Sequence, residues 1–160
     1  MKFDCTFMGE SARIATYHRT EAKGAFGMAN EKEKGKRKPH NKEIGRKGEA
    51  AAARYLQYVG YEIVDRNWSC PAGEVDIVAR DGDVLVFCEV KTRTNINKGF
   101  PSEAVDAEKR AKYEKIAAWY VRDYTFTDIP VRFDVIALLV VGEDRALMKH
   151  YVNAFAQGCC

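Results

Sequence analysis

The pattern of apolar and polar positions changes sharply near residue 41. In residues 1–40 apolar residues are sparse and follow no clear period, which is typical of a disordered segment. The next stretch, EIGRKGEAAAARYLQYVG, is rich in alanine and other helix formers. Its apolar residues are spaced for one face of a helix: Ile44, Ala52, Tyr55, Leu56 and Val59. The pattern therefore predicts a long helix that ends at Gly60.

The rest of the chain alternates between strand-like and helix-like patterns. We predict three strands, a helix and two strands, at residues 61–68, 73–79, 84–93, 103–123, 131–141 and 145–152. The run 131–141 is almost continuously apolar, as expected for a strand that is covered on both faces. The order αβββαββ indicates an α/β domain with a mixed central sheet flanked by helices.

Composition supports one globular domain with tails. The chain has 160 residues, of which 46% are hydrophobic and 31% charged, as in soluble globular proteins. Residues 31–38 read EKEKGKRK, so we predict a disordered basic N-terminal extension over 1–40, a folded domain over 41–153 and a C-terminal tail over 154–160. The net charge of +3 is too small by itself to indicate a nucleic-acid partner.

Cysteine and histidine usage argues against a zinc site. None of the five cysteines forms a C-x-x-C pair, and the three histidines are scattered. Irregular cysteines are typical of free thiols in a reducing compartment. The first twenty residues contain no apolar segment of signal-peptide length, and the run 135–141 is too short to span a bilayer. We therefore expect a cytoplasmic protein that does not enter a membrane.

Charged residues gather at one end of the hairpin predicted over residues 73–93. With Asp81-Gly82 as a two-residue turn, Arg80 faces Asp83. Glu74 then faces Glu89, and Asp76 is a diagonal neighbour of Glu89. Side chains alternate between faces, so one face is entirely apolar and forms core: Val75, Ile77, Ala79, Val84, Val86, Cys88 and Val90.

Three clustered carboxylates repel one another unless a cation intervenes. Mg²⁺ suits Asp76 and Glu89 because it needs only one or two carboxylates besides water and substrate phosphate. The carbonyl of Val90 is a candidate third ligand, and Lys91 on the same face is placed to orient a water molecule. The alternative is a charged, solvent-facing sheet end, since Glu-x-Lys arises easily by chance in a chain that is 31% charged.

The motifs GRKGEAAAARYL, GYEIVDRNW, GEVDIVA, VFCEVKTR, GFPSEAV and RFDVIAL occur in this order and closely resemble the YraN family of uncharacterised bacterial proteins. That family looks like the PD-(D/E)xK superfamily, which has the restriction-endonuclease-like fold and includes Holliday-junction resolvases. The resemblance covers residues 41–152. It implies that Asp76 is a metal-binding acid, that Glu89 and Lys91 are the Glu-x-Lys pair, and that Glu49 completes the metal shell or holds a water.

The expected function is therefore Mg²⁺- or Mn²⁺-dependent hydrolysis of phosphodiester bonds in DNA, with branched or repair intermediates as candidate substrates. Candidate nucleic-acid contacts are Arg46, Lys47, Thr92 and Arg93. A homodimer is a further expectation, because cutting two strands favours two sites. A non-catalytic nucleic-acid-binding or interaction module with the same fold is the alternative, and a nuclease acting on RNA is a weaker one.

Other polar residues favour structural roles. Asp134 lies inside a buried strand, so we expect it to pair with Arg132 or a helix residue rather than with a metal. Lys109, Arg110 and Lys112 are typical of a solvated helix face, with contact to phosphate groups as the alternative. Glu49 also suits a solvated acid near a helix N-terminus.

Overall fold

The structure is a computed structural model that describes residues 2–7, 12–18, 38–95, 97, 107–122, 129–142 and 145–155. Its elements are β1 (Lys2–Phe7), β2 (Ala12–His18), α1 (Lys38–Tyr58), β3 (Glu62–Cys70), β4 (Gly73–Asp81), β5 (Val84–Arg93), α2 (Ala107–Val121), β6 (Val131–Val140) and β7 (Arg145–Tyr151). From α1 onward the order is the predicted αβββαββ. Within the described residues, no helix is long and apolar enough to cross a membrane.

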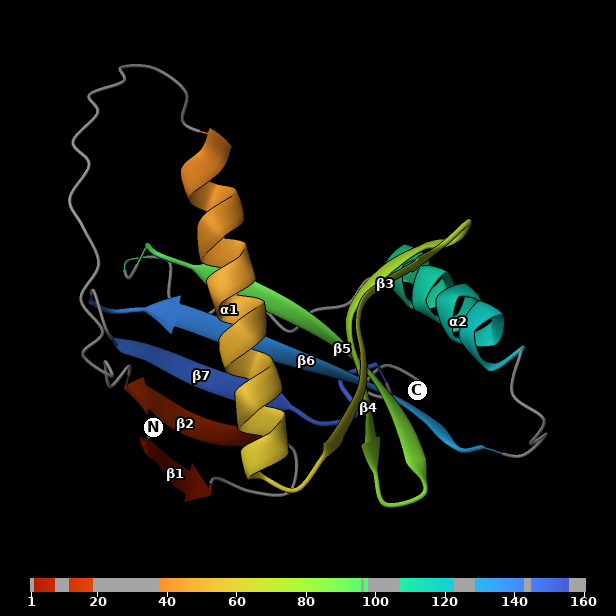
Figure 1. The fold of residues 1–160 in the computed structure, drawn as a ribbon, viewed down its shortest axis with the longest axis horizontal. Coiled ribbons are helices and arrows are strands. Elements are labelled where there is room, and N and C mark those ends of the chain that lie inside the picture. The colour runs from red at the N-terminus through yellow and green to blue at the C-terminus, as the bar shows by residue number, and fades with distance from the viewer. Residues whose placement is uncertain are drawn as a thin grey trace, which may run out of the picture.

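The strands form one mixed sheet in the order β1-β2-β7-β6-β5-β4-β3 (Figure 1). Only the β5–β6 pair is parallel among those described. Parallel neighbours need a crossover, and α2 lies in the segment that joins them. The five strands β3 to β7 with the two helices confirm the predicted α/β fold of a mixed sheet flanked by helices, which is consistent with a restriction-endonuclease-like fold.

The described ends of the chain differ from the predicted tails. β1 pairs with β2, and β2 pairs with β7, so residues 2–7 and 12–18 extend the sheet. The prediction of a disordered extension is therefore wrong for these two segments, and residues 19–37 lie outside the described part. At the other end, the Ala154 amide donates to the carbonyl of Phe133 at 2.8 Å, and Phe155 is buried. The domain therefore continues at least to residue 155.

The helices cover opposite faces of the sheet, and each face has its own hydrophobic core. On one face, α1 packs with Ile77, Ala79, Val86 and Cys88. On the other, α2 packs with residues of the opposite parity, such as Val78 and Phe87. The alternation predicted for the hairpin is therefore confirmed, except at Val75. This residue belongs to the core under α2 and not to that under α1.

The hairpin register differs from the prediction by two residues. Asp81 pairs with Val84, and Ile77 pairs with Cys88, so Gly82 and Asp83 form the loop in place of Asp81 and Gly82. Gly82 has a φ of 58°, a conformation that favours glycine in two-residue hairpin loops. Because the shift is even, it does not itself move side chains between faces, but Glu74 no longer faces Glu89.

Asp134 forms the centre of a buried polar network between β6 and β7. Its carboxylate accepts hydrogen bonds from Arg132 Nε at 3.0 Å and from the Asn153 amide at 2.8 Å, and it lies 2.9 Å from His150 Nε2. Arg132 also reaches Asp81 at 2.9 Å. The predicted pairing of Asp134 with Arg132 is confirmed.

Candidate functional site

The site lies where β4 separates from β5. Their described pairing ends at Ile77 and Cys88, and the next positions in the same register are Asp76 and Glu89. The first residues of β4 remain paired with β3 alone, for example Val75 with Trp68, and both strands curve toward α2 (Figure 1). This curvature turns Val75 toward the core under α2.

Irregular backbone in β3 accompanies this bend. The β3–β4 register shifts between Ile63 and Asp65, and Asn67 has a φ of 53°. Such irregularities increase local twist and bend a strand. The separated hairpin leaves the edge of β5 open at Val90, whose amide donates a hydrogen bond to Asp76 Oδ2 at 2.7 Å. Asp76 thus bridges the gap between the two strands.

Glu89 is held by two side chains of α2. Its Oε1 forms an ion pair with Lys109 Nζ at 2.5 Å, and its Oε2 accepts a hydrogen bond from the Tyr113 hydroxyl. Lys109 and Tyr113 are four residues apart and therefore lie on one helix face. Both carboxylate oxygens of Glu89 thus have fixed partners on α2.

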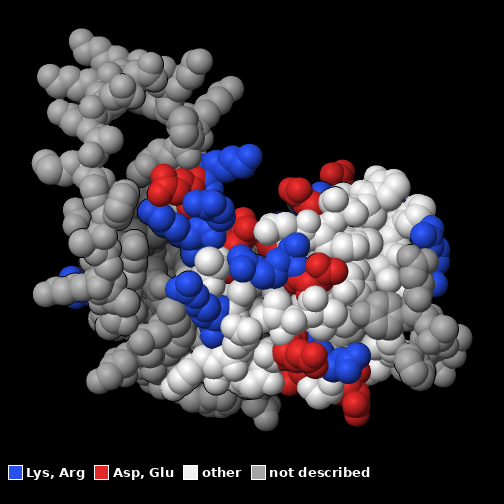
Figure 2. Space-filling model, viewed as in Figure 1, with Lys and Arg blue, Asp and Glu red and all other residues white. Residues whose placement is uncertain are grey.

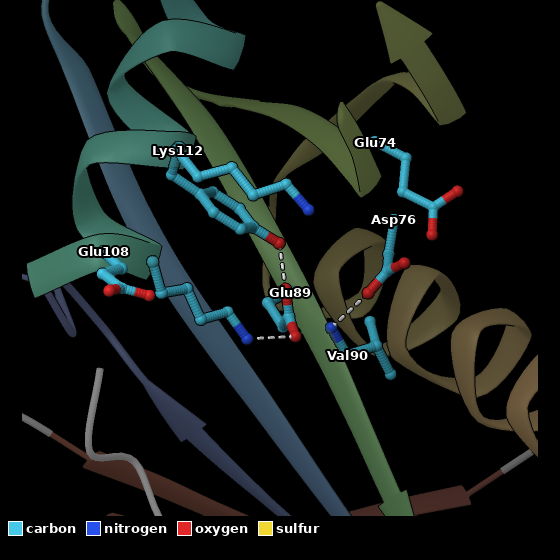
Figure 3. A pocket seen from close by; sticks show the side chains of 8 residues that line it. Glu74, Asp76, Glu89, Val90, Glu108 and Lys112 are labelled. Carbon is cyan, nitrogen blue, oxygen red and sulfur yellow. Dashed lines mark hydrogen bonds and ion pairs between the residues drawn. The ribbon is translucent and has the colours of Figure 1, made fainter. Parts of the chain in front are cut away.

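A cavity of about 580 Å³ opens at this point. Figure 3 shows its lining residues, which come from β4, β5 and α2: Glu74, Asp76, Glu89, Val90, Glu108, Lys109, Lys112 and Tyr113. Asp76 and Glu89 therefore reach one cavity, as the alternation along the hairpin predicts. Four carboxylates and two ammonium groups share this space.

Burial and neighbouring carboxylates raise the pKa values of two groups of the site, Asp76 and Tyr113. Burial, which disfavours the charged form, raises the pKa of Asp76 from 3.8 to about 6. The negative charges of Glu89, Glu49 and Glu74 raise this pKa further, and the hydrogen bond from Val90 opposes the shift. Burial and the charge of Glu89 also raise the pKa of Tyr113, so its hydroxyl stays protonated as a donor. Burial and the neighbouring carboxylates therefore both disfavour the charged form of Asp76.

Not every predicted site residue lines the cavity. Glu49 is half-buried on α1 and influences Asp76 through its charge, but it is outside the lining set. Lys91 is half-buried on β5 and is also outside that set. Its proposed work on a water molecule stays a prediction.

The predicted nucleic-acid contacts lie on α1 and at the end of β5. Arg46, Lys47 and Arg93 are exposed, and Lys47 pairs with Glu43 at 2.8 Å. Thr92 is half-buried, and its hydroxyl has no hydrogen-bond partner among the residues that the structure describes. Figure 2 shows Lys and Arg side chains interspersed with Asp and Glu on the visible face, without a single large basic patch.

Sequence reasoning did not place α2 in the site. Lys109 and Lys112 were expected on a solvated helix face, with phosphate contact as the alternative. Lys112 is exposed and Lys109 is half-buried, and both line the cavity. The available signal is the spacing of Lys109, Lys112 and Tyr113 at i, i+3 and i+4, which puts them on one helix face. Nothing in that spacing shows that this face meets Asp76 and Glu89.

The donor set suits a hard cation only in part. Among the described residues, no group of three or more His, Cys, Asp or Glu side chains is arranged to hold a metal ion. Mg²⁺, however, usually keeps several waters and takes one or two carboxylates. Asp76, crowded by acids and buried enough to shift its pKa, is a carboxylate that a cation would stabilise in its charged form.

Comparison with known proteins identifies the family. Residues 48–138 match the model of uncharacterised protein family UPF0102. A UPF0102 protein of Geobacter sulfurreducens is 48% identical over 117 residues, which cover 72% of this chain and 91% of the relative. One from Caldanaerobacter subterraneus is 43% identical over 121 residues, covering 74% of this chain and 99% of the relative. The chain therefore belongs to UPF0102, the YraN family.

Proposed function

We propose that this protein is a nuclease that uses Mg²⁺ or Mn²⁺ to hydrolyse phosphodiester bonds in DNA. The observation that carries the proposal is the convergence of Asp76 and Glu89 on one cavity at the separation of β4 and β5. The crowding of Asp76 by Glu89, Glu49 and Glu74 supports it, because a divalent cation would relieve the repulsion.

In this proposal Asp76 and Glu89 hold the ion, with the carbonyl of Val90 as a third ligand. A bound Mg²⁺ would supply a more acidic water and neutralise charge on the phosphate. Tyr113 and Lys109 fix the orientation of the Glu89 carboxylate. Glu49 assists from α1, and Lys91 orients the attacking water.

Cleavage assays test this function. Linear DNA, branched DNA and RNA are incubated with the purified protein in Mg²⁺, in Mn²⁺ and in a chelator. We expect metal-dependent cleavage of DNA that Asp76→Ala and Lys91→Ala each reduce at least a hundredfold. Asp83→Ala, which removes an exposed acid from the loop of the same hairpin, is the matched control. The proposal is wrong if Asp76→Ala still cleaves DNA. It is also wrong if the wild type shows no metal-dependent cleavage of any substrate.

One observation favours a second candidate, a nucleic-acid-binding module without catalysis. Both oxygens of Glu89 already have partners on α2, so the site is arranged without an ion. This candidate predicts binding that weakens with salt, does not change in Asp76→Ala, and is not followed by cleavage.

A further inference from the structure

We propose that Lys112 of α2 binds a phosphate group of the nucleic acid in this cavity. The inference deepens the proposed function and rests on it for the nature of the ligand. The sequence predicts Lys91 as the lysine of the site, but Lys91 does not line the cavity, whereas Lys112 does.

The path of the Lys112 side chain depends on Gly73. A Cβ atom placed on Gly73 would lie 2.4 Å from Cε of Lys112, 3.1 Å from its Nζ and 3.3 Å from Cδ1 of Ile116. The aliphatic part of Lys112 therefore crosses β4 where that strand has no side chain. Figure 3 shows its ammonium group pointing into the cavity, toward the side where Glu74 and Asp76 lie.

The two lysines of the cavity have different surroundings. Lys109 forms an ion pair with Glu89 at 2.5 Å, so its charge is already balanced. For Lys112, no hydrogen bond or ion pair occurs within the part of the chain that the structure describes. Lys112 is thus the cavity's ammonium group that can approach a ligand without first leaving a carboxylate.

A phosphodiester that enters this cavity needs a positively charged group close to it. Glu74, Asp76, Glu89 and Glu108 line the same cavity and would repel an anion. A cation held by Asp76 and Glu89 would reduce that repulsion, and a lysine acts as a compact positive charge for phosphate oxygens. The alternative is a lysine whose stem covers Ile116 while its ammonium is only solvated.

Binding measurements separate these possibilities. Fluorescence anisotropy of a labelled DNA oligonucleotide is followed in Ca²⁺, which also takes oxygen ligands, at several salt concentrations. Lys112→Met keeps the stem and removes the charge. We expect it to weaken binding about tenfold and to reduce the slope of log affinity against log salt by about 0.7 to 0.9, the value for one phosphate contact.

Two variants serve as controls. Lys115→Met makes the same change at an exposed position of α2 outside the cavity lining, and we expect wild-type affinity and slope. Lys112→Arg keeps the charge and should retain most of the affinity. An equal loss in Lys112→Met and Lys115→Met would overturn the inference, because it would mark a general effect of net charge. An equal loss in Lys112→Met and Lys112→Arg would also overturn it, because it would mark disturbed packing.

Cleavage assays on the same proteins distinguish this inference from the proposed function. If the wild type cleaves and Lys112→Met keeps wild-type affinity and salt slope, the Lys112 inference is wrong and the nuclease stands. If Lys112→Met loses affinity and slope but the wild type cleaves nothing, phosphate binding by Lys112 is supported and the nuclease proposal fails. If the wild type does not bind DNA or RNA, both are wrong.

Discussion

Asp76 shows most directly how position changes the chemistry of a single residue. At the separation of β4 and β5 its carboxylate accepts a hydrogen bond from the Val90 amide at 2.7 Å. Burial nevertheless raises its pKa to about 6. Folding therefore favours the protonated form of Asp76, and the charged form is present at a cost above that pH.

Asp76→Asn should stabilise the metal-free protein at high pH. The folded-state pKa lies above the unfolded value of 3.8, so wild-type stability relative to the variant falls as pH rises through about 6. Urea unfolding should find the variant more stable by about 1 to 3 kcal/mol at pH 8, with a smaller difference at pH 4.5. Asp83→Asn, at an exposed position, should show no such trend. A stability difference between Asp76→Asn and the wild type that does not depend on pH would contradict the raised pKa of Asp76.

The pKa of Asp134 is shifted in the opposite direction, although its side chain is fully buried. Burial alone would raise its pKa, but the hydrogen bonds with His150, Arg132 and the Asn153 amide outweigh burial and lower the pKa below 3.8. Asp134→Ala should destabilise the protein by about 3 to 5 kcal/mol at pH 7, since it leaves buried partners uncompensated.

The pH dependence checks this cause. Because the folded pKa is depressed, the contribution of Asp134 is complete above its unfolded pKa and is lost as pH falls through the folded value. The stability difference between wild type and Asp134→Ala, measured by urea unfolding, should therefore shrink only below about pH 4. A difference already lost at pH 6 would contradict this explanation.

At the scale of elements, one close contact fixes α1 on the sheet. A Cβ atom placed on Gly48 would lie 2.0 Å from Oγ1 of Thr92 and 3.2 Å from its Cβ, so glycine allows the helix to approach β5. Glu49 is the next residue, and its charge acts on Asp76. The contact between Gly48 and Thr92 therefore sets how far this acid lies from the site.

Gly48→Ala should destabilise the protein, whereas Gly45→Ala should not. The first adds a methyl group that forces α1 and β5 apart, at about 1 to 3 kcal/mol. In the second, the added Cβ has no atom of another described segment within 4 Å, so the substitution should stabilise the helix by about 0.5 to 1 kcal/mol. Chemical denaturation measures both. Thr92→Ala should partly rescue Gly48→Ala, and equal effects of the two glycine substitutions would contradict the close contact.

At the scale of the whole molecule, the site exists because α2, which follows the hairpin in the chain, packs back against one face of the sheet. The crossover between parallel strands β5 and β6 contains α2, whose Lys109, Lys112 and Tyr113 meet a hairpin that lies earlier in the sequence. The cavity therefore requires the complete arrangement of hairpin, helix and sheet.

A divalent cation should raise the stability of this whole arrangement. If Asp76 and Glu89 hold Mg²⁺ only when folded, the ion at a hundred times its dissociation constant adds about 2.7 kcal/mol. Thermal unfolding should show a higher midpoint with Mg²⁺ or Mn²⁺ for the wild type and little change for Asp76→Asn. An equal rise in both proteins would place the ion elsewhere.

The sequence by itself determined the features that depend on near neighbours along the chain. Alanine-rich periodicity predicts α1, and alternation in the hairpin puts Asp76 and Glu89 on the same side. This last prediction held although the turn was placed one residue too early, because a register shift of two positions preserves parity. The motifs that resemble the YraN family are also short stretches of neighbouring residues.

Only the tertiary structure decided which distant segments meet. It fixed the register of β4 and β5, the separation that turns Val75 toward α2, the pairing of β2 with β7, and the presence of Lys109 and Lys112 in the cavity. These features depend on how whole faces of helices and strands pack against each other. Local spacing gives the face on which a residue lies, but it does not give the partner of that face.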